Sequence, residues 1–372
     1  MENLIFFIPS LAKGGAERVA VRLLPELSKA FSLTLFLIDR EITYPVPEGL
    51  EIISMNDTTT GTLSHLLNIP GHVLSLSRIV KRKGAEIVLS FLEEANIINL
   101  LSSKLTGHKT VISQHTPPIL QYKRKGALGK AILSASKRFY PKADHIIAVS
   151  KGIKEMLIKE YRLSQHKITV IPNPIDLVEI NANAKVVHDI ELPARFILNA
   201  GRIQFKVKGQ DILIMAFGKI AHKFPDVFLV FLGEGPDLAG AIKLAKDSAL
   251  SEKILFLGWR EDVLAIMSRS EVFVLSSRYE GWPNVLVEAM ACKCPVIATD
   301  CLTGPKEILD DGKYGILVPP EDPDTLARSL ELMLEDAGMR NRYGKLAYDR
   351  AKVFEVSGIC GKYIEVIKRV TK

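Results

Sequence analysis

Short apolar runs alternate with longer amphipathic stretches along most of the chain. Each run predicts a strand, and the stretches between the runs predict helices; in residues 16–30, for example, Val19, Leu23 and Leu27 recur at helical spacing. Strands that alternate with helices are typical of parallel sheets built from βα units. The predicted strands are 3–8, 33–38, 51–54, 86–90, 110–113, 145–149 and 168–171 in the first half, and 196–200, 227–232, 254–257, 272–275, 295–298 and 315–318 in the second.

The strand pattern stops in the middle of the chain. Residues 171–193 are polar, lack periodicity and contain three prolines, which predicts a linker. A chain of 372 residues also exceeds one ordinary domain. We therefore expect an α/β protein of two doubly wound parallel-sheet domains, residues 1–178 and 179–353. Two such domains imply a cleft between them, and ligands of parallel sheets bind at the carboxyl ends of the strands.

The composition is that of a globular protein, with 47% hydrophobic and 24% charged residues. This balance excludes disordered, collagenous and coiled-coil classes. No apolar run approaches the roughly 18 residues that span a bilayer, and an acid at position 2 disfavours a signal peptide. We expect a cytoplasmic protein whose four cysteines, all in the second half, are reduced packing residues: Cys292, Cys294, Cys301 and Cys360.

The net charge of +7 belongs entirely to the first half of the chain. Residues 1–180 carry 23 basic against 16 acidic side chains, whereas the remainder carries 26 of each. Several of these basic residues are clustered in the sequence, and such clusters suit anionic lipid headgroups, a pyrophosphate or nucleic acid, with a plain solubility role as the alternative. Nucleic acid is disfavoured because no aromatic residues interleave with the cations. The clustered cations are Lys81, Arg82, Lys83, Lys123, Arg124, Lys125, Lys130, Lys137, Arg138 and Lys142.

Two loops of the first domain are candidates for chemistry. Gly14 and Gly15 follow the first strand and precede a helix, where backbone amides can approach a phosphate; a tight turn is the alternative. Their spacing is not GxGxxG, so a nicotinamide dinucleotide site is weakly supported. His115 follows the fifth strand at its carboxyl end, as a candidate catalytic residue or as an ordinary surface histidine.

The second domain begins with a strand that delivers cations to its carboxyl end. Arg202 follows this strand directly, and Lys206 and Lys208 come before the next helix. A guanidinium binds two phosphate oxygens in bidentate fashion, and an ammonium adds a point charge. Two fixed cations can therefore neutralise a diphosphate without a metal ion, although each alone could be a solvated surface residue.

The segment 276–291 contains the most informative pattern. A strand ends, a Gly-Pro turn follows, and Asn284 is predicted as the N-cap of an apolar helix whose first amides form an anion site. Glu288 lies four residues after Asn284 and is the sole carboxylate of that helix, so sugar or ribose hydroxyls would satisfy it. Glu280 precedes the turn. The alternatives are a loop acid for Glu280 and a solvated helix residue for Glu288.

Glu280 and Glu288 form an E-x7-E motif. With the Gly-Gly loop, the Arg202/Lys208 pair and the GPKEIL segment, the chain resembles the retaining glycosyltransferases of family 4, which have the GT-B fold of two Rossmann-like domains. It is similar to bacterial members that add hexose or N-acetylhexosamine to lipid-linked or cell-surface glycans. The resemblance covers essentially the whole chain and is most specific over residues 277–301.

The resemblance implies a role for each candidate residue. Arg202 and Lys208 would hold the donor diphosphate, Glu288 the nucleotide ribose, and Glu280 the donor-sugar hydroxyls. The family interval from arginine to lysine is five residues and here it is six, so Lys206 is an alternative to Lys208. The last helix, residues 354–372, would cross back to the first domain. The remaining donor-side positions are Gly281, Pro283, Asn284 and Val285 at the sugar and phosphates, Gly258 at the nucleobase, Gly14 and Gly15 at the phosphate and acceptor, and His115 beside the sugar.

The implied reaction moves a sugar from a nucleotide diphosphate sugar, expected to be a UDP-sugar, to an acceptor hydroxyl with retention of anomeric configuration. No cofactor and no metal are expected. The acceptor would be a lipid-linked or cell-surface glycan, with the protein peripheral on the cytoplasmic face of the inner membrane. The alternatives are a GT-B nucleotide-sugar epimerase and a non-catalytic nucleotide-sugar-binding protein.

Overall fold

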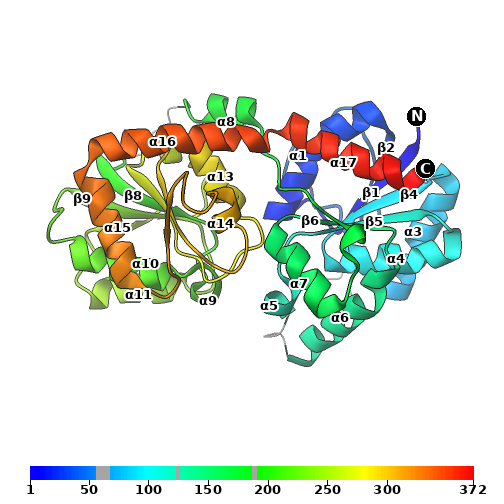
Figure 1. The fold of residues 1–372 in the computed structure, drawn as a ribbon, viewed down its shortest axis with the longest axis horizontal. Coiled ribbons are helices and arrows are strands. Elements are labelled where there is room, and N and C mark those ends of the chain that lie inside the picture. Colours follow the sequence, from blue (N-terminus) through cyan, green and yellow to red (C-terminus); the bar gives the residue numbers. More distant parts are fainter. Residues whose placement is uncertain (56–67, 123–125, 187–190) are drawn as a thin grey trace. The chain divides into compact units, whose positions relative to one another are not determined.

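The chain forms two compact units, each built around one parallel sheet (Figure 1). One unit is Met1–Pro174 together with Val356–Lys372, and the other is Ile175–Glu355. The alternation of strands and helices predicted from the sequence is confirmed in both, and the α/β class with it. The structure, a computed structural model, describes residues 1–55, 68–122, 126–186 and 191–372.

The sheet of the first unit has seven strands in the order β3-β2-β1-β4-β5-β6-β7. Every pairing is parallel; Leu4 of β1 lies opposite Leu33 of β2 on one side and Ile87 of β4 on the other. The strands are β1 (Asn3–Ile8), β2 (Ser32–Leu37), β3 (Glu51–Ser54), β4 (Ile87–Phe91), β5 (Lys109–Gln114), β6 (His145–Ala148) and β7 (Ile168–Val170). The helices are α1 (Gly15–Ala30), α3 (Ile69–Lys83), α4 (Glu93–Thr106), α5 (Pro118–Tyr122), α6 (Gly126–Phe139), α7 (Lys151–Tyr161) and α17 (Val356–Thr371).

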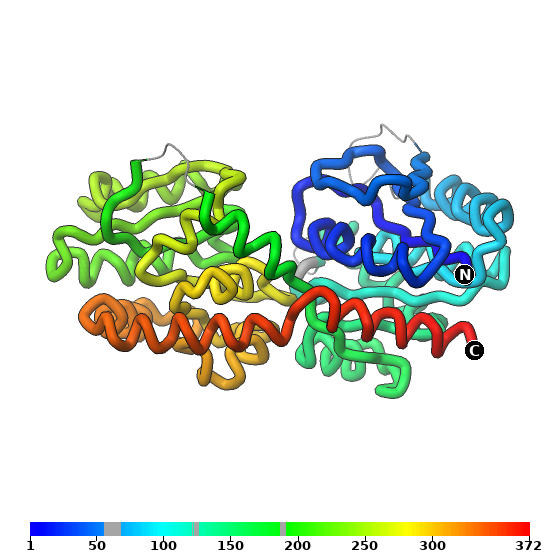
Figure 2. Tube along the Cα trace, turned by 90° about the horizontal axis from the view of Figure 1, so that it is seen from above, coloured from blue at the N-terminus to red at the C-terminus, as the bar shows by residue number. Residues whose placement is uncertain are grey.

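Both faces of this sheet are covered by helices, which explains why its central strands β1 and β4 are almost entirely apolar. Successive side chains of a strand point to opposite faces. Leu4 and Phe6 therefore pack with α1 and α17, while Ile5 and Phe7 pack with α3 and α4. The C-terminal helix α17 contributes Tyr363 to this core and lies beside α1 in both views (Figures 1 and 2).

The sheet of the second unit has six parallel strands in the order β10-β9-β8-β11-β12-β13. Helices α10, α11 and α15 form the core on one face, and α13 contacts α12 and α16. The strands are β8 (Arg195–Ala200), β9 (Val227–Leu232), β10 (Ile254–Phe256), β11 (Val272–Leu275), β12 (Val296–Thr299) and β13 (Ile316–Val318). The helices are α8 (Leu177–Asn183), α9 (Phe205–Lys208), α10 (Gln210–Ile220), α11 (Leu238–Asp247), α12 (Val263–Arg269), α13 (Asn284–Ala291), α14 (Pro305–Ile308), α15 (Pro323–Glu335) and α16 (Ala337–Ala351).

The strand order of each sheet reverses at one place, and this positions the candidate residues. In the first sheet the reversal lies between β1 and β4, and in the second between β8 and β11. The carboxyl ends of parallel strands lie at the same edge of the sheet. At the reversal, the loops that follow the two neighbouring strands run in opposite directions and leave a crevice between them, where ligands of such sheets bind. The Arg202 loop follows β8 and the Glu280 loop follows β11, so both belong to one switch point.

The predicted linker contains a helix that the sequence interpretation missed. Helix α8 begins after Asp176, whose carboxylate accepts a hydrogen bond from the amide of Glu179 at 2.9 Å. An aspartate followed three residues later by a glutamate is a helix-start signal. The absence of apolar periodicity concealed it, because the helix is only two turns long. None of the helices in the described ranges combines the length and apolar character needed to span a bilayer.

Candidate active site

The first part of the site is the short connection between β8 and α10. It consists of Arg202, which is exposed, and the single turn α9, which ends in Lys208. Gly209 follows with φ of +61°, and a Cβ there would lie 2.1 Å from the carbonyl oxygen of Ser276. Only glycine fits this position, and it brings the turn that carries Lys208 directly against the loop after β11.

Lys208 and Glu280 are in direct contact across these two loops. The Lys208 ammonium donates to Glu280 Oε1 at 2.6 Å, and the Ser277 hydroxyl donates to the same oxygen at 2.6 Å. The side chains of Lys208 and Glu280 are 25% and 9% exposed. A largely buried carboxylate requires such donors, and a charged donor is the strongest kind. The structure thus brings together two of the predicted donor ligands.

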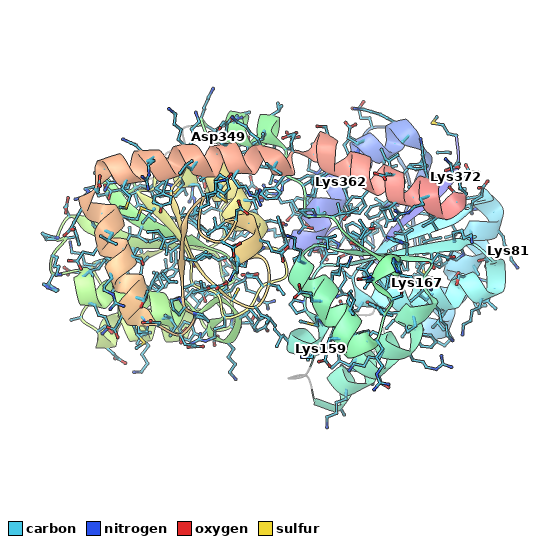
Figure 3. The ribbon with its side chains drawn as sticks, viewed as in Figure 1. Lys81, Lys159, Lys167, Asp349, Lys362 and Lys372 are labelled. Carbon is cyan, nitrogen blue, oxygen red and sulfur yellow. The ribbon has the colours of Figure 1, made fainter. Side chains whose placement is uncertain are left out.

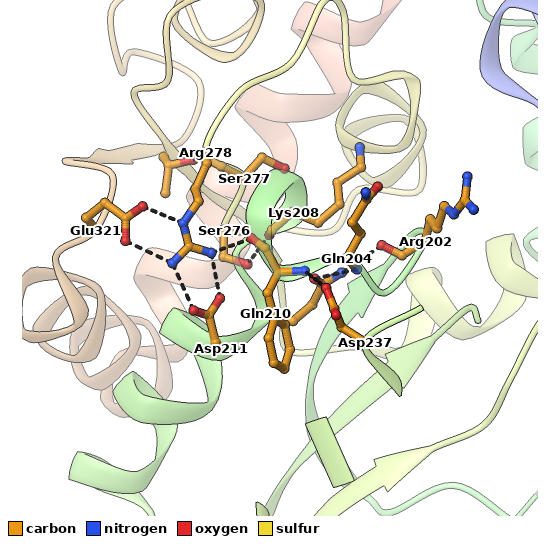
Figure 4. Close-up of polar contacts among 12 residues, drawn as sticks. Arg202, Gln204, Lys208, Gln210, Asp211, Asp237, Ser276, Ser277, Arg278 and Glu321 are labelled. Carbon is orange, nitrogen blue, oxygen red and sulfur yellow. Dashed lines mark hydrogen bonds and ion pairs between the residues drawn. The ribbon is translucent and has the colours of Figure 1, made fainter. Parts of the chain in front are cut away.

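A buried glutamine holds the start of the same connection. Gln210, fully buried, donates from Nε2 to the carbonyl oxygen of Arg202 at 3.0 Å and accepts from the amide of Gln204 at 3.2 Å. Figure 4 shows the side chains of Arg202 and Lys208 extending away from this clamp. The sequence interpretation did not include Gln210, although it directly follows the Lys-Gly pair that drew attention to Lys208.

Helix α13 begins one residue earlier than predicted. Pro283, not Asn284, is the N-cap; its backbone is extended, and its carbonyl oxygen accepts from the amide of Leu286 at 3.0 Å. Asn284 and Val285 therefore open the first turn, and both are partly exposed. Glu288, one turn further along, is 3% exposed. The prediction of Asn284 as the N-cap was wrong because an extended proline fits that position equally well.

The loops after β8, β9 and β10 pack against one another through glycines. The amide of Gly233 donates to the carbonyl oxygen of Gly258 at 2.6 Å, and a Cβ on Gly233 would lie 2.2 Å from the carbonyl oxygen of Gly201. Gly258 has φ of +66°. The predicted nucleobase loop is therefore joined to the cation-bearing loop by close backbone contacts that side chains would prevent.

In the first unit, the start of α1 is occupied by one of its own side chains. Gly14 is the N-cap of α1, and a Cβ there would lie 2.0 Å from Glu17 Oε2. The amides of Ala16 and Glu17 hydrogen-bond the Glu17 carboxylate, whose pKa is raised because it is buried. A phosphate at Gly14 and Gly15 would meet this carboxylate first, and their role stays a prediction.

His115 lies at the carboxyl end of β5 and is 7% exposed. Its ring centroid is 4.3 Å from that of Phe91. Burial lowers the pKa of His115 to about 3, so the imidazole is neutral near pH 7. Within the described residues, neither ring nitrogen has a hydrogen-bond partner. The residue is therefore suited to hydrogen bonding with a ligand and not to supplying a positive charge.

A buried carboxyl group that the sequence interpretation missed supports the loop of His115. Glu93, the first residue of α4, accepts from Gln114 Nε2 at 2.6 Å and from the Tyr122 hydroxyl at 3.2 Å. Burial raises the pKa of Glu93. Residues on either side of His115 are thereby tied to α4, and the sole signal in the sequence was a pair of acids directly after a strand.

The predicted basic surface is only partly described. Lys130, Lys137 and Arg138 are exposed on α6, and Lys137 lies 3.8 Å from Glu160. Lys130 and Lys137 are two helical turns apart on one face, about 10 Å at 1.5 Å per residue. Residues 123–125 lie outside the described residues. Other exposed cations, among them Lys81 of α3 and Lys159 of α7, lie on different elements of the first unit (Figure 3).

The remaining predictions concern thiols and metals. All four cysteines are free thiols, as predicted, and all but Cys292 are buried. Across 1–55, 68–122, 126–186 and 191–372, no three His, Cys, Asp or Glu side chains are grouped so that they could hold a metal ion.

Comparison with known proteins gives the family. The family "Glycosyl transferases group 1" matches residues 181–350, and "Glycosyltransferase Family 4" matches residues 13–179. A relative from Campylobacter jejuni, the N-acetylgalactosamine-N,N'-diacetylbacillosaminyl-diphospho-undecaprenol 4-alpha-N-acetylgalactosaminyltransferase, is 34% identical over 361 residues, covering 95% of this chain and 96% of the relative. The chain belongs to glycosyltransferase family 4. It is a glycosyltransferase of the hexosyltransferase type, as the E-x7-E motif predicted.

Two further comparisons agree with this family. The Escherichia coli UDP-Gal:alpha-D-GlcNAc-diphosphoundecaprenol alpha-1,3-galactosyltransferase is 26% identical over 71% of this chain and 70% of its own length. The crystal structure of Anabaena HepE in complex with UDP superposes with a TM-score of 0.79 at 20% identity, over 99% of this chain and 100% of that one. The GT-B fold expected of family 4 is therefore confirmed.

Proposed function

We propose that the protein is a retaining glycosyltransferase that moves a hexose or N-acetylhexosamine from a UDP-sugar to a lipid-linked diphosphate glycan. Family membership supports sugar transfer. The names of the two bacterial relatives support the details, since both specify diphospho-undecaprenol acceptors and α-linked products, and one specifies a UDP donor. UDP-hexoses ordinarily carry the sugar α-linked to the diphosphate, so an α-linked product implies retention.

The observation that carries the proposal is the contact between Lys208 and Glu280 at the switch point of the second sheet. Lys208 and Arg202 would bind the diphosphate, and Glu280, already fixed by two donors, would bind hydroxyls of the donor sugar. The amides of Gly281, Asn284 and Val285 would support the sugar and phosphates.

In the proposed reaction, the bond between the anomeric carbon and the diphosphate oxygen breaks, and a bond to the acceptor oxygen forms on the same face. The acceptor proton passes to the departing diphosphate. Negative charge grows on that diphosphate during the reaction, and the fixed cations Arg202 and Lys208 stabilise it. His115, neutral because it is buried, would hydrogen-bond the donor sugar, and Glu288 would hold the ribose.

The acceptor class implies work at a membrane surface. We include in the proposal a peripheral position on the cytoplasmic face of the inner membrane, with the exposed cations Lys130, Lys137 and Arg138 of α6 facing anionic lipid. The first unit's excess of basic residues supports this, because neutralising anionic headgroups requires several cations together.

The decisive experiment is a transfer assay with the purified protein. UDP-sugars are first screened by thermal shift, and each one that binds is then offered with a diphosphate-prenyl-linked glycan acceptor; the anomeric configuration of the product is read by NMR. We expect glycan extended by one α-linked sugar. Isomerised nucleotide sugar without transfer would indicate an epimerase, and binding without turnover would indicate a non-catalytic binder.

A further inference from the structure

Helix α9 is a single turn, so most of its carbonyl oxygens need partners from outside the helix. The loop after β11 supplies them. The Ser276 hydroxyl donates to the carbonyl oxygen of Lys208 at 2.9 Å, and the amide of Arg278 donates to the carbonyl oxygen of Val207 at 2.8 Å. The orientation of the turn that carries Lys208 therefore depends on residues that immediately precede Glu280.

The side chain of Arg278 holds the same turn from a second direction. Its Nη1 donates to the carbonyl oxygen of Phe205, the first residue of α9, and to Asp211 Oδ1 at 2.7 Å. Its Nη2 donates to Asp211 Oδ2 at 2.8 Å and to Glu321 Oε2 at 2.9 Å, and its Nε donates to Glu321 Oε1. Figure 4 shows these bonds converging on one guanidinium.

Each of the five N–H groups of Arg278 is thus used. The side chain is 20% exposed, and its two carboxylate partners come from α10 and from the segment before α15. Lysine has three donors on one nitrogen and lacks the planar fork, so it cannot replace this set of bonds. The arrangement fixes α9 relative to three other elements and requires arginine specifically.

We propose that Arg278 is a positioning residue for donor binding, which holds the α9 turn so that Lys208 stays in register with Glu280. The inference rests on the proposed function, in which these two side chains contact the donor. Arg278 itself does not touch the substrate in this proposal; Figure 4 shows Lys208 and Arg202 extending away from the Arg278 cluster. Displacements on the order of 1 Å at a reacting centre are enough to slow an enzyme about a hundredfold.

A second arginine of the same unit provides a matched control. Arg195 opens β8, at the opposite edge of the sheet from the Lys208 loop, and binds carboxylates in the same manner. Its Nε and Nη2 donate to Glu271 at 2.7 and 3.1 Å, its Nη1 donates to Asp226 at 2.9 Å, and its Nη2 also reaches the carbonyl oxygen of Leu334 at 3.3 Å. Replacing it by lysine breaks a comparable network away from the site.

The test compares Arg278→Lys with Arg195→Lys in the full chain. We measure Tm, donor kcat/KM and acceptor KM, together with UDP affinity by calorimetry. We expect both variants to lower Tm, but only Arg278→Lys to lower donor kcat/KM and UDP affinity, by about tenfold, with acceptor KM within twofold. If Arg278→Lys fails to fold, Asp211→Asn is measured in its place. This variant keeps the arginine but weakens its hydrogen bonds to residue 211, and we expect the same changes in donor kcat/KM and UDP affinity.

The double variant Arg278→Lys/Lys208→Ala separates this inference from the proposed function. If Arg278 acts through Lys208, the double variant is no slower than Lys208→Ala alone. Two results would overturn the positioning role of Arg278. One is an equal donor kcat/KM in Arg278→Lys and Arg195→Lys; the other is a loss of kcat/KM in the double variant that equals the product of the losses in the two single variants. Unchanged transfer in Lys208→Ala would instead overturn the assignment of Lys208 in the proposed function.

Discussion

Lys208 donates a hydrogen bond to Glu280 over 2.6 Å, although 72 positions separate the two residues along the chain. The contact exists because β8 and β11 are neighbours at the switch point of the second sheet, so the loops that follow them meet. One side chain is a predicted phosphate ligand and the other a predicted sugar ligand. Before a donor arrives, each therefore neutralises and orients the other.

Replacing Lys208 by alanine should lower transfer at least tenfold, because charge that develops on the leaving diphosphate loses a fixed cation. Tenfold corresponds to about 1.4 kcal/mol of transition-state stabilisation. Arg202→Ala should cause a loss of similar size. Steady-state rates with donor varied provide the measurement.

Lys206→Ala is the control for this prediction, since Lys206 is exposed on the same turn and also follows Arg202. We expect it to retain transfer within twofold. The reverse result, with Lys206 required and Lys208 dispensable, would show that Lys206 binds the diphosphate.

A chelator should leave the reaction rate unchanged if Arg202 and Lys208 neutralise the diphosphate in place of a metal ion, as we propose. The measurement is the initial transfer rate of protein dialysed against EDTA, with and without added magnesium. Loss of activity in EDTA that magnesium restores would contradict the metal-independent mechanism.

The stability of the first unit should fall as the pH is lowered from 7 to 5, in part because of His115. Burial holds its pKa at about 3 in the folded protein, whereas the unfolded chain binds a proton below about pH 6.5. Stability is therefore gained as the pH rises through this window and lost as it falls. His115 should account for on the order of 2 kcal/mol between pH 7 and pH 5.

Urea unfolding of His115→Gln at the two pH values tests this prediction. The variant should lose less stability on acidification than the wild type. His166→Gln, at an exposed histidine, is the control and should behave as the wild type does. Buried His108 and His145, whose pKa values burial lowers to about 4, contribute to the remaining pH dependence of all three proteins. Identical slopes for wild type and His115→Gln would contradict the low pKa.

Reversing the charges of Lys123, Arg124 and Lys125 to glutamate should reduce co-sedimentation with anionic liposomes, because each cation near such a surface contributes about 1 kcal/mol of attraction. A second triple variant at Lys130, Lys137 and Arg138 should have a comparable effect, and salt should weaken binding of the wild type. The control is an equal charge change at exposed lysines of the second unit: Lys219, Lys243 and Lys246. If the control reduces binding equally, only net charge matters and no particular surface is involved.

The strands could be predicted from the sequence because both sheets are parallel and covered on both faces, which makes most strands predominantly apolar runs. Residues 3–8, 51–54, 227–232 and 272–275 match strands of the structure end to end. Helix α8 was missed because it is too short to show an apolar face, and its start depends on a capping side chain.

The candidate site could be predicted less completely. Residue type and position after a strand identified Arg202, Lys208 and Glu280 one at a time. Their contact, and the role of Arg278 in bringing it about, depends on which strands are neighbours, and no local pattern in the sequence contains that information. Arg278 lies within the most specific motif, but the sequence does not show which groups its side chain contacts. Its positioning role becomes visible only when the five acceptors of its N–H groups are known.

Helix α17 follows the second unit in the sequence but completes the core of the first, where Ile359, Tyr363 and Ile367 are buried. During synthesis on the ribosome, the first unit cannot complete its fold until the last helix has emerged, whereas the second unit can fold earlier. A premature stop after residue 355 would spare the donor-side residues and still leave the other half with an exposed apolar face. Such a truncated protein should aggregate or be degraded, even though every residue proposed to contact the donor diphosphate and ribose is intact.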